Sequence, residues 1–99
     1  MTGRVRVIVY YAASEEDVTE AYERANKEMR GTPGLLGAEL LRSMLDGDRF
    51  AVLSEWTSRT AFLAWEQGAR HRDQTSALRP YEDHAGGRSY TVYEVIGEL

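Results

Sequence analysis

Hydrophobic and polar residues alternate along two segments of the chain, as they do in β-strands with one buried face. Between Arg4 and Tyr11, one side of the expected strand carries Val5, Val7, Val9 and Tyr11, and the other carries Arg6, Ile8 and Tyr10. The alternation returns between Ser89 and Glu98. Both segments are rich in β-branched and aromatic residues, which strands favour. The pattern therefore predicts a first strand over 4–11 and a last strand over 89–98.

Helical periodicity follows each of two serines that can act as N-caps. Ser14 precedes three acidic residues, which favour the positive end of a helix dipole. The apolar face of this first helix comprises Val18, Ala21, Tyr22, Ala25 and Met29, and the run Gly31-Thr32-Pro33-Gly34 ends it. Ser58 can cap a second helix, whose apolar patch comprises Ala61, Phe62, Ala64 and Trp65 and ends near Gly68. One or two further helical turns are expected from Ala69 to Arg79, before Pro80.

A β-hairpin is expected between the two helices. Leu35–Leu45 and Arg49–Thr57 flank Asp46-Gly47-Asp48, whose glycine can take the positive φ that a hairpin loop needs. Both faces of these strands are apolar. In the first strand we expect Leu36, Ala38 and Leu40 on one side and Leu35, Gly37 and Leu41 on the other; in the second, Phe50, Val52 and Trp56 oppose Ala51 and Leu53. One helical layer covers only one face, so the other is expected to meet a second copy of the chain.

The order of elements, β-α-β-β-α-β, predicts a ferredoxin-like α+β fold with an antiparallel sheet. A chain of 99 residues buries only about two-thirds of its unfolded surface and supports one core. We therefore expect residues 1–99 to form a single domain that is stabilised by a partner copy in a homodimer.

Composition and charge exclude several classes of protein. The chain has no cysteine, which rules out disulfides, thiolate nucleophiles and cysteine-based metal sites. It has no signal-like segment and no apolar run of about 18 residues. The 12 basic and 16 acidic residues are scattered and give a net charge of −4, which argues against nucleic acid as a partner. These features predict a cytoplasmic protein with neither a membrane nor a nucleic-acid partner.

His71 is the leading candidate for chemistry, since an imidazole can accept and return a proton near neutral pH. On the expected helix it shares a stripe with Thr75 and Leu78. The alternative is a structural histidine that is buried and hydrogen-bonded, or partly exposed beside basic neighbours. His84 lies in a polar glycine-rich loop 13 residues further on, a spacing that matches no helical metal motif, so no metal site is expected.

Trp56 and Trp65 offer large flat surfaces that could hold a planar aromatic ligand. Both could equally be core residues, and this alternative is stronger for Trp56. Several of the six tyrosines could orient a phenol or line a dimer interface with one end in water.

Read in order, Pro33-Gly34, Glu55-Trp56, Ala61-Phe62-Leu63-Ala64-Trp65 and His71-Arg72 resemble the antibiotic biosynthesis monooxygenase family. The resemblance extends from the first strand through the last. It implies a dimeric α+β barrel, and in many members an oxidation of aromatic compounds without flavin or metal. The same fold also hosts haem-degrading enzymes, polyketide cyclases and proteins of other roles.

For this chain the resemblance implies a cofactor-free monooxygenase that oxidises a polycyclic phenol or anthrone to a quinone in aromatic polyketide biosynthesis, with molecular oxygen as the co-substrate. His71 would be the base, Trp65 and Trp56 would hold the ring, and Tyr81 or Arg88 would meet the oxyanion. The haem-degrading branch typically uses an Asn on the first strand, and Arg4–Ala13 contains none. An aromatic polyketide cyclase and a non-catalytic ligand-binding barrel are the alternatives.

Overall fold

The computed structural model describes residues 3–99, which form one four-stranded sheet and a layer of helices. The elements in chain order are β1 (Val5–Ala12), α1 (Glu15–Met29), β2 (Leu35–Arg42), β3 (Arg49–Trp56), α2 (Arg59–Glu66), α3 (His71–Gln74), the 3-10 turn η1 (Arg79–Tyr81) and β4 (Tyr90–Glu94). The sheet has the order β2-β3-β1-β4 and every pairing is antiparallel. The predicted ferredoxin-like α+β fold is confirmed.

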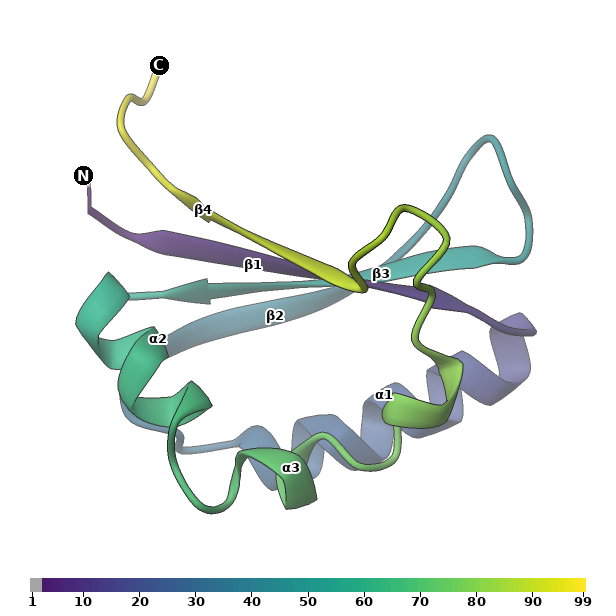
Figure 1. Cartoon of the computed structure of the whole chain (residues 1–99), viewed down its shortest axis with the longest axis horizontal. Helices are drawn as coiled ribbons and strands as arrows, with labels where there is room; N and C mark the ends of the chain where they lie inside the picture. The colour runs from purple at the N-terminus through teal and green to yellow at the C-terminus, as the bar shows by residue number, and fades with distance from the viewer. Residues whose placement is uncertain (1–2) are drawn as a thin grey trace.

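All three helices lie on the same face of the sheet (Figure 1). The side of β1 that carries Val5, Val7, Val9 and Tyr11 faces them, and Val5, Val7 and Tyr11 are buried. In the antiparallel register Val5 faces Trp56 and Tyr11 faces Phe50, so β1 and β3 present one continuous apolar surface. The core therefore lies between this surface and the helices.

Local capping rules account for the helix starts. The Ser14 hydroxyl accepts a hydrogen bond from the backbone N–H of Asp17 at 3.2 Å, and the Ser58 hydroxyl accepts one from Ala61 at 3.1 Å. On α1 the predicted face is buried at Val18, Ala21 and Ala25. Of the helices in residues 3–99, none is long and apolar enough to cross a membrane.

The side-chain directions expected at the start of β2 are wrong at two residues. The pairing of β2 with β3 shifts between Leu35 and Gly37, and a shift of one residue turns every side chain before it to the opposite face. Leu35 consequently lies on the helix side with Ala38, whereas Leu36 is 53% exposed. Alternation within the sequence carries no sign of such a bulge.

Three elements are shorter than the sequence predicts. Strand β2 ends at Arg42, because the Ser43 hydroxyl accepts hydrogen bonds from the backbone N–H groups of Leu45 and Asp46 and turns the chain. Strand β4 covers 90–94 and not 89–98. The expected helix over 69–79 is a single α-turn, α3, followed by tighter turns that lead into η1.

The second face of the sheet has no helix over it in the described part of the chain (Figure 1). The register places Ile8 beside Leu53 and Tyr10 beside Ala51 on this face. Tyr93, which pairs with Arg6 there, is 59% exposed. We call this surface, made of Ile8, Tyr10, Ala51, Leu53 and Tyr93, the open face.

Candidate functional site

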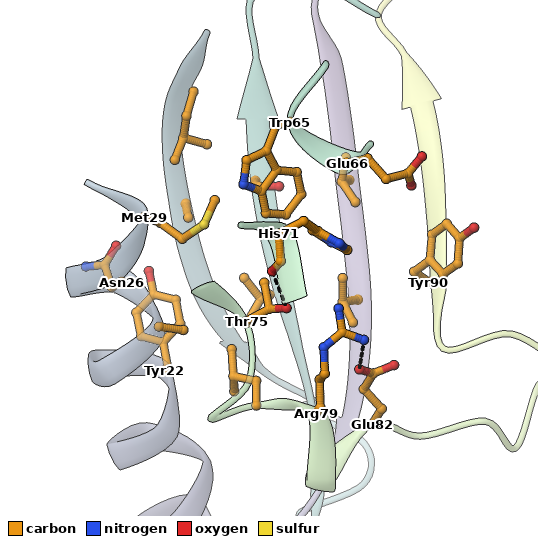
Figure 2. A pocket seen from close by; sticks show the side chains of 18 of the residues that line it. Tyr22, Asn26, Met29, Trp65, Glu66, His71, Thr75, Arg79, Glu82 and Tyr90 are labelled. Carbon is orange, nitrogen blue, oxygen red and sulfur yellow. Dashed lines mark hydrogen bonds and ion pairs between the residues drawn. The ribbon is translucent and has the colours of Figure 1, made fainter. Parts of the chain in front are cut away.

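A cavity of about 300 Å³ lies between the sheet and the helical layer. Its size falls at the lower end of the range of small-molecule sites. Residues from four strands and all three helices line it, and most of them are apolar. Figure 2 shows the charged side chains of Glu66, Arg79 and Glu82, together with His71, on the side of the cavity toward β4, and Asn26 and Tyr22 on the side of α1. A site of this kind suits a flat apolar ligand with a polar group at one end.

Three aromatic residues form one end of the cavity. Trp56, at the end of β3, is fully buried, and its ring centroid lies 5.0 Å from that of Trp65 and 5.7 Å from that of Phe62. Its indole N–H donates to the Ser54 hydroxyl at 3.0 Å. Trp56 is therefore a core residue that also forms part of the cavity wall, whereas Trp65 is only half-buried.

Two hydrogen bonds in series fix the orientation of Trp65. Its indole N–H donates to the side-chain oxygen of Gln74 at 2.8 Å. The amide nitrogen of Gln74 donates in turn to the backbone carbonyl of Glu28 at 3.0 Å. Trp65 on α2 is thus connected through α3 to α1, and its ring is held at the cavity.

His71 lies directly beside Trp65. The imidazole meets the indole edge-on, with ring centroids 4.4 Å apart and planes at 89° (Figure 2). Burial lowers the pKa of His71 below its ordinary value, and the charge of Arg79 lowers it further, while Glu66 acts in the opposite direction. At neutral pH the ring is accordingly neutral and carries a lone pair on one nitrogen. That is the form a general base requires.

A charged group that the sequence did not predict completes the polar end. Arg79 lines the cavity from η1, with its Nη1 atom 4.0 Å from a carboxylate oxygen of Glu82. The Ser89 hydroxyl donates to the other oxygen of Glu82 at 2.7 Å. Burial raises the pKa of Tyr11, and so does the nearby Glu82, so the phenol of Tyr11 stays protonated. No helical spacing marks Arg79 in the sequence, because α3 ends at Gln74 and Arg79 lies in η1.

The two residues expected to meet an oxyanion lie away from the cavity. Tyr81 packs half-buried against the core cluster that includes Tyr11 and Phe50, and Arg88 is exposed before β4. Neither lines the cavity. Tyr81 misses the cavity because Arg79 and Tyr81 point in different directions from η1. Arg79 points into the cavity, and Tyr81 points toward the core cluster.

The second histidine of the chain also lies away from the cavity. His84 is exposed in the loop before β4. Within residues 3–99 no three histidine, aspartate or glutamate side chains come together in a way that could hold a metal ion.

Comparison with known proteins gives relatives of three kinds. Protein SchA of Streptomyces halstedii is 29% identical over 97% of this chain, but the chain spans only 26% of SchA. The Heme oxygenase (mycobilin-producing) of Mycobacterium tuberculosis strain H37Rv is 28% identical over 94% of this chain and 87% of its own length. The crystal structure of SnoaB, a cofactor-independent oxygenase from Streptomyces nogalater, superposes with a TM-score of 0.77 at 15% identity over 98% of this chain and 97% of SnoaB.

The likeness to SnoaB supports the fold alone, because 15% sequence identity is too low to carry a conclusion about function. The family itself follows from a direct match, since the model of the antibiotic biosynthesis monooxygenase family fits residues 4–75. This range includes Trp56, Trp65 and His71. The chain therefore belongs to the antibiotic biosynthesis monooxygenase family, a family of oxidoreductases.

Proposed function

We propose that this chain is a cofactor-independent monooxygenase that oxidises a polycyclic phenol or anthrone to a quinone in aromatic polyketide biosynthesis. The observation that carries the proposal is the contact between Trp65 and His71 at the wall of a largely apolar cavity. The indole offers a surface for a flat ring, and the neutral imidazole offers a base next to it. Family membership and the relative SnoaB, a cofactor-independent oxygenase, support the same chemistry.

In this reaction the substrate supplies the electrons. His71 takes a proton from the acidic C–H or O–H of the substrate, and the resulting anion passes one electron to dioxygen. Recombination of the two radicals forms a C–O bond and a peroxide anion, which takes the proton back from His71. Loss of the remaining hydrogen of that carbon with cleavage of the O–O bond then gives the carbonyl and water. For an anthrone the balance is CH₂ + O₂ → C=O + H₂O, in which four electrons leave the substrate and reduce one O₂. The protein needs to hold the ring, accept the proton and stabilise the anion.

We further propose that the chain acts as a homodimer in the cytoplasm. The open face leaves apolar side chains on a sheet without a second layer, and a second copy of the same face would cover them. The absence of cysteine agrees with a reducing compartment.

Haem degradation is a second candidate, because the similar Heme oxygenase (mycobilin-producing) is matched over most of its length. The residues of β1 argue against it. The wall formed by β1 consists of Val7, Val9 and Tyr11, and the strand carries no Asn for the role that the haem-degrading branch implies. Titration with hemin tests this candidate. A saturable Soret band that disappears in His71→Ala would favour haem, and no saturable band would exclude it.

Oxygen uptake by metal-free protein with dithranol, an anthrone, tests the proposed function. We expect uptake without added cofactor, and a loss of about 10²–10⁴-fold in turnover in His71→Ala. His84→Ala is the matched control, since His84 is exposed and does not line the cavity. Uptake that is independent of His71 would remove it from the mechanism. Binding of dithranol without uptake would favour a cyclase or a binding barrel.

A further inference from the structure

The guanidinium of Arg79 has one buried N–H donor, at Nε, for which the described part of the protein supplies no acceptor. An arginine carries five N–H donors. Within residues 3–99 the only charged partner of Arg79 is Glu82 at 4.0 Å, which is too long for a hydrogen bond. The Nε atom is buried, and no described group accepts a hydrogen bond from it. Buried donors normally have acceptors, so a buried Nε without one, in a side chain that lines a cavity, points to an acceptor brought by a ligand.

Glu82 is held in a way that keeps it from neutralising Arg79 more closely. One of its carboxylate oxygens accepts the short hydrogen bond from Ser89, a buried residue next to β4. The backbone on either side is also fixed, because Tyr11 and Glu82 form an isolated β-bridge and the N–H of Asp83 donates to the carbonyl of Tyr10. The carboxylate therefore stays beside the guanidinium without a direct hydrogen bond to it.

We infer that Arg79 binds the oxyanion of the ligand, and that the ligand is an aromatic compound with an acidic oxygen, a phenol or an enol, bound as its anion between Arg79 and His71. Glu82, held by Ser89, is a nearby negative charge that partly offsets the positive charge of Arg79. This inference rests on the proposed function and names the group of that site that stabilises the substrate anion. Arg79 is better placed for this role than Arg88, which lies outside the cavity.

The charges around His71 fit proton transfer from such a ligand. When the imidazole accepts the proton, it becomes a cation facing Glu66 and Glu82, and both carboxylates favour that charge. Arg79 and Arg72 disfavour a positive charge on His71, and the negative oxygen of the ligand offsets the effect of Arg79. Transfer of the proton thus creates an anion beside a guanidinium and a cation beside two carboxylates. Both products of the transfer are stabilised by fixed charges.

The test uses alizarin, a hydroxyanthraquinone whose phenolate absorbs at a longer wavelength than its phenol. The pKa of the protein-bound dye is read from its absorption during a pH titration. We expect wild-type protein to lower that pKa relative to water, and Arg79→Met to raise it by about one unit, a tenfold loss of preference for the phenolate. Glu82→Gln removes a nearby negative charge and should lower the bound pKa further. A purely structural role of these residues would not produce shifts of opposite sign.

Two controls and one replacement variant make the result decisive. Arg49→Met removes an arginine that pairs with Asp83 at 3.8 Å and does not line the cavity, and it should leave the bound pKa unchanged. Anthraquinone, which has no hydroxyl, should quench tryptophan fluorescence equally in wild type and Arg79→Met. If circular dichroism shows that Arg79→Met is unfolded, Arg79→Lys and Glu82→Gln replace it in the test. Arg79→Lys keeps the positive charge and should keep the lowered dye pKa, whereas Glu82→Gln should lower the dye pKa further.

An unchanged dye pKa in Arg79→Met or Glu82→Gln, or no binding of alizarin to the wild type, would overturn the inference. These outcomes are separable from failure of the proposed function. A dye shift that depends on Arg79 without oxygen uptake from dithranol would support the anion site and refute the oxygenase. Uptake with a dye pKa that does not depend on Arg79 would support the oxygenase and refute the anion site.

Discussion

Gly34 and Ala61 approach each other so closely that a Cβ atom on Gly34 would lie 2.4 Å from the Cβ of Ala61. Gly34 also has a φ of +84°, in the left-handed region that favours glycine. Its carbonyl accepts a hydrogen bond from the N–H of Thr57 at 2.8 Å, just before α2. This contact fixes the start of β2 against the helix that carries Trp65. Glycine at position 34 therefore allows the close packing that places α2, and with it Trp65, at the cavity.

Gly34→Ala should lower the free energy of unfolding by at least about 2 kcal/mol, because a left-handed alanine and an overpacked contact each cost about 1–3 kcal/mol. Gly31→Ala is the matched control. Gly31 has a φ of +79° but nothing within 4 Å of the added Cβ, so it should lose only the backbone contribution. Urea denaturation measures both. Equal losses in the two variants would show that the contact with Ala61 relaxes without cost.

Gln74→Leu should weaken ligand binding more than folding. The change removes the acceptor that orients the indole of Trp65, a hydrogen bond of about 1 kcal/mol, and affinity for alizarin should fall roughly fivefold. Titration of tryptophan fluorescence gives the dissociation constant. Gln67→Leu, at an exposed position after α2, is the control and should bind as the wild type does. Unchanged affinity in Gln74→Leu would mean that Trp65 keeps its orientation by packing alone.

The pH dependence of kcat/KM should show an acidic limb with a midpoint below 6.5, the ordinary value for histidine. Only neutral His71 accepts a proton, so activity falls as pH decreases through its lowered pKa. Since Glu66 raises that pKa, Glu66→Gln should move the limb to still lower pH, and Arg72→Met should move it upward. Initial rates of oxygen uptake with dithranol between about pH 4 and about pH 8 measure the limb. A midpoint above 6.5 in the wild type would contradict the assignment.

Substitution of the two tryptophans should have different effects, with Trp56 contributing mainly to stability and Trp65 mainly to ligand binding. Trp56→Ala should cost about 3–5 kcal/mol of stability, as removal of a fully buried aromatic side chain does. Trp65→Ala, at a half-buried position, should cost less stability but lose most of the affinity for alizarin. Chemical denaturation and absorption titration provide the two numbers. Loss of stability in Trp65→Ala as large as in Trp56→Ala would make Trp65 chiefly a core residue.

The chain should behave as a dimer in size-exclusion chromatography with light scattering at micromolar concentration. Leu53→Glu introduces a charge into the open face and should shift the protein toward monomer, because an unpaired charge is costly to bury in an interface. Ala64→Glu adds the same charge to an exposed position of α2, on the other side of the sheet, and should remain dimeric. A wild-type monomer would refute the dimer.

The amino-acid sequence by itself determined the order and type of the elements. The alternation in β1 and the serines before α1 and α2 are signals that act within a few residues, and such local preferences are legible along the chain. The cavity positions of His71, Trp56 and Trp65 could be anticipated for the same reason. Each residue shares its face with apolar neighbours at regular spacing. The positive φ expected at Gly47 is wrong, because the glycines with a positive φ in residues 3–99 are Gly3, Gly31, Gly34 and Gly87.

Only the tertiary structure decided the polar end of the cavity and the exact pairing of the strands. The bulge that turns Leu35 inward depends on the register with β3, which no single segment encodes. Arg79, and not Arg88 or Tyr81, reaches the cavity because the helix after His71 gives way to tighter turns. A charged side chain enters a largely apolar interior only where other charged or polar groups lie near it. Here Glu82 lies 4.0 Å from Arg79, and its carboxylate is held by Ser89 beside β4, which the fold brings back next to β1.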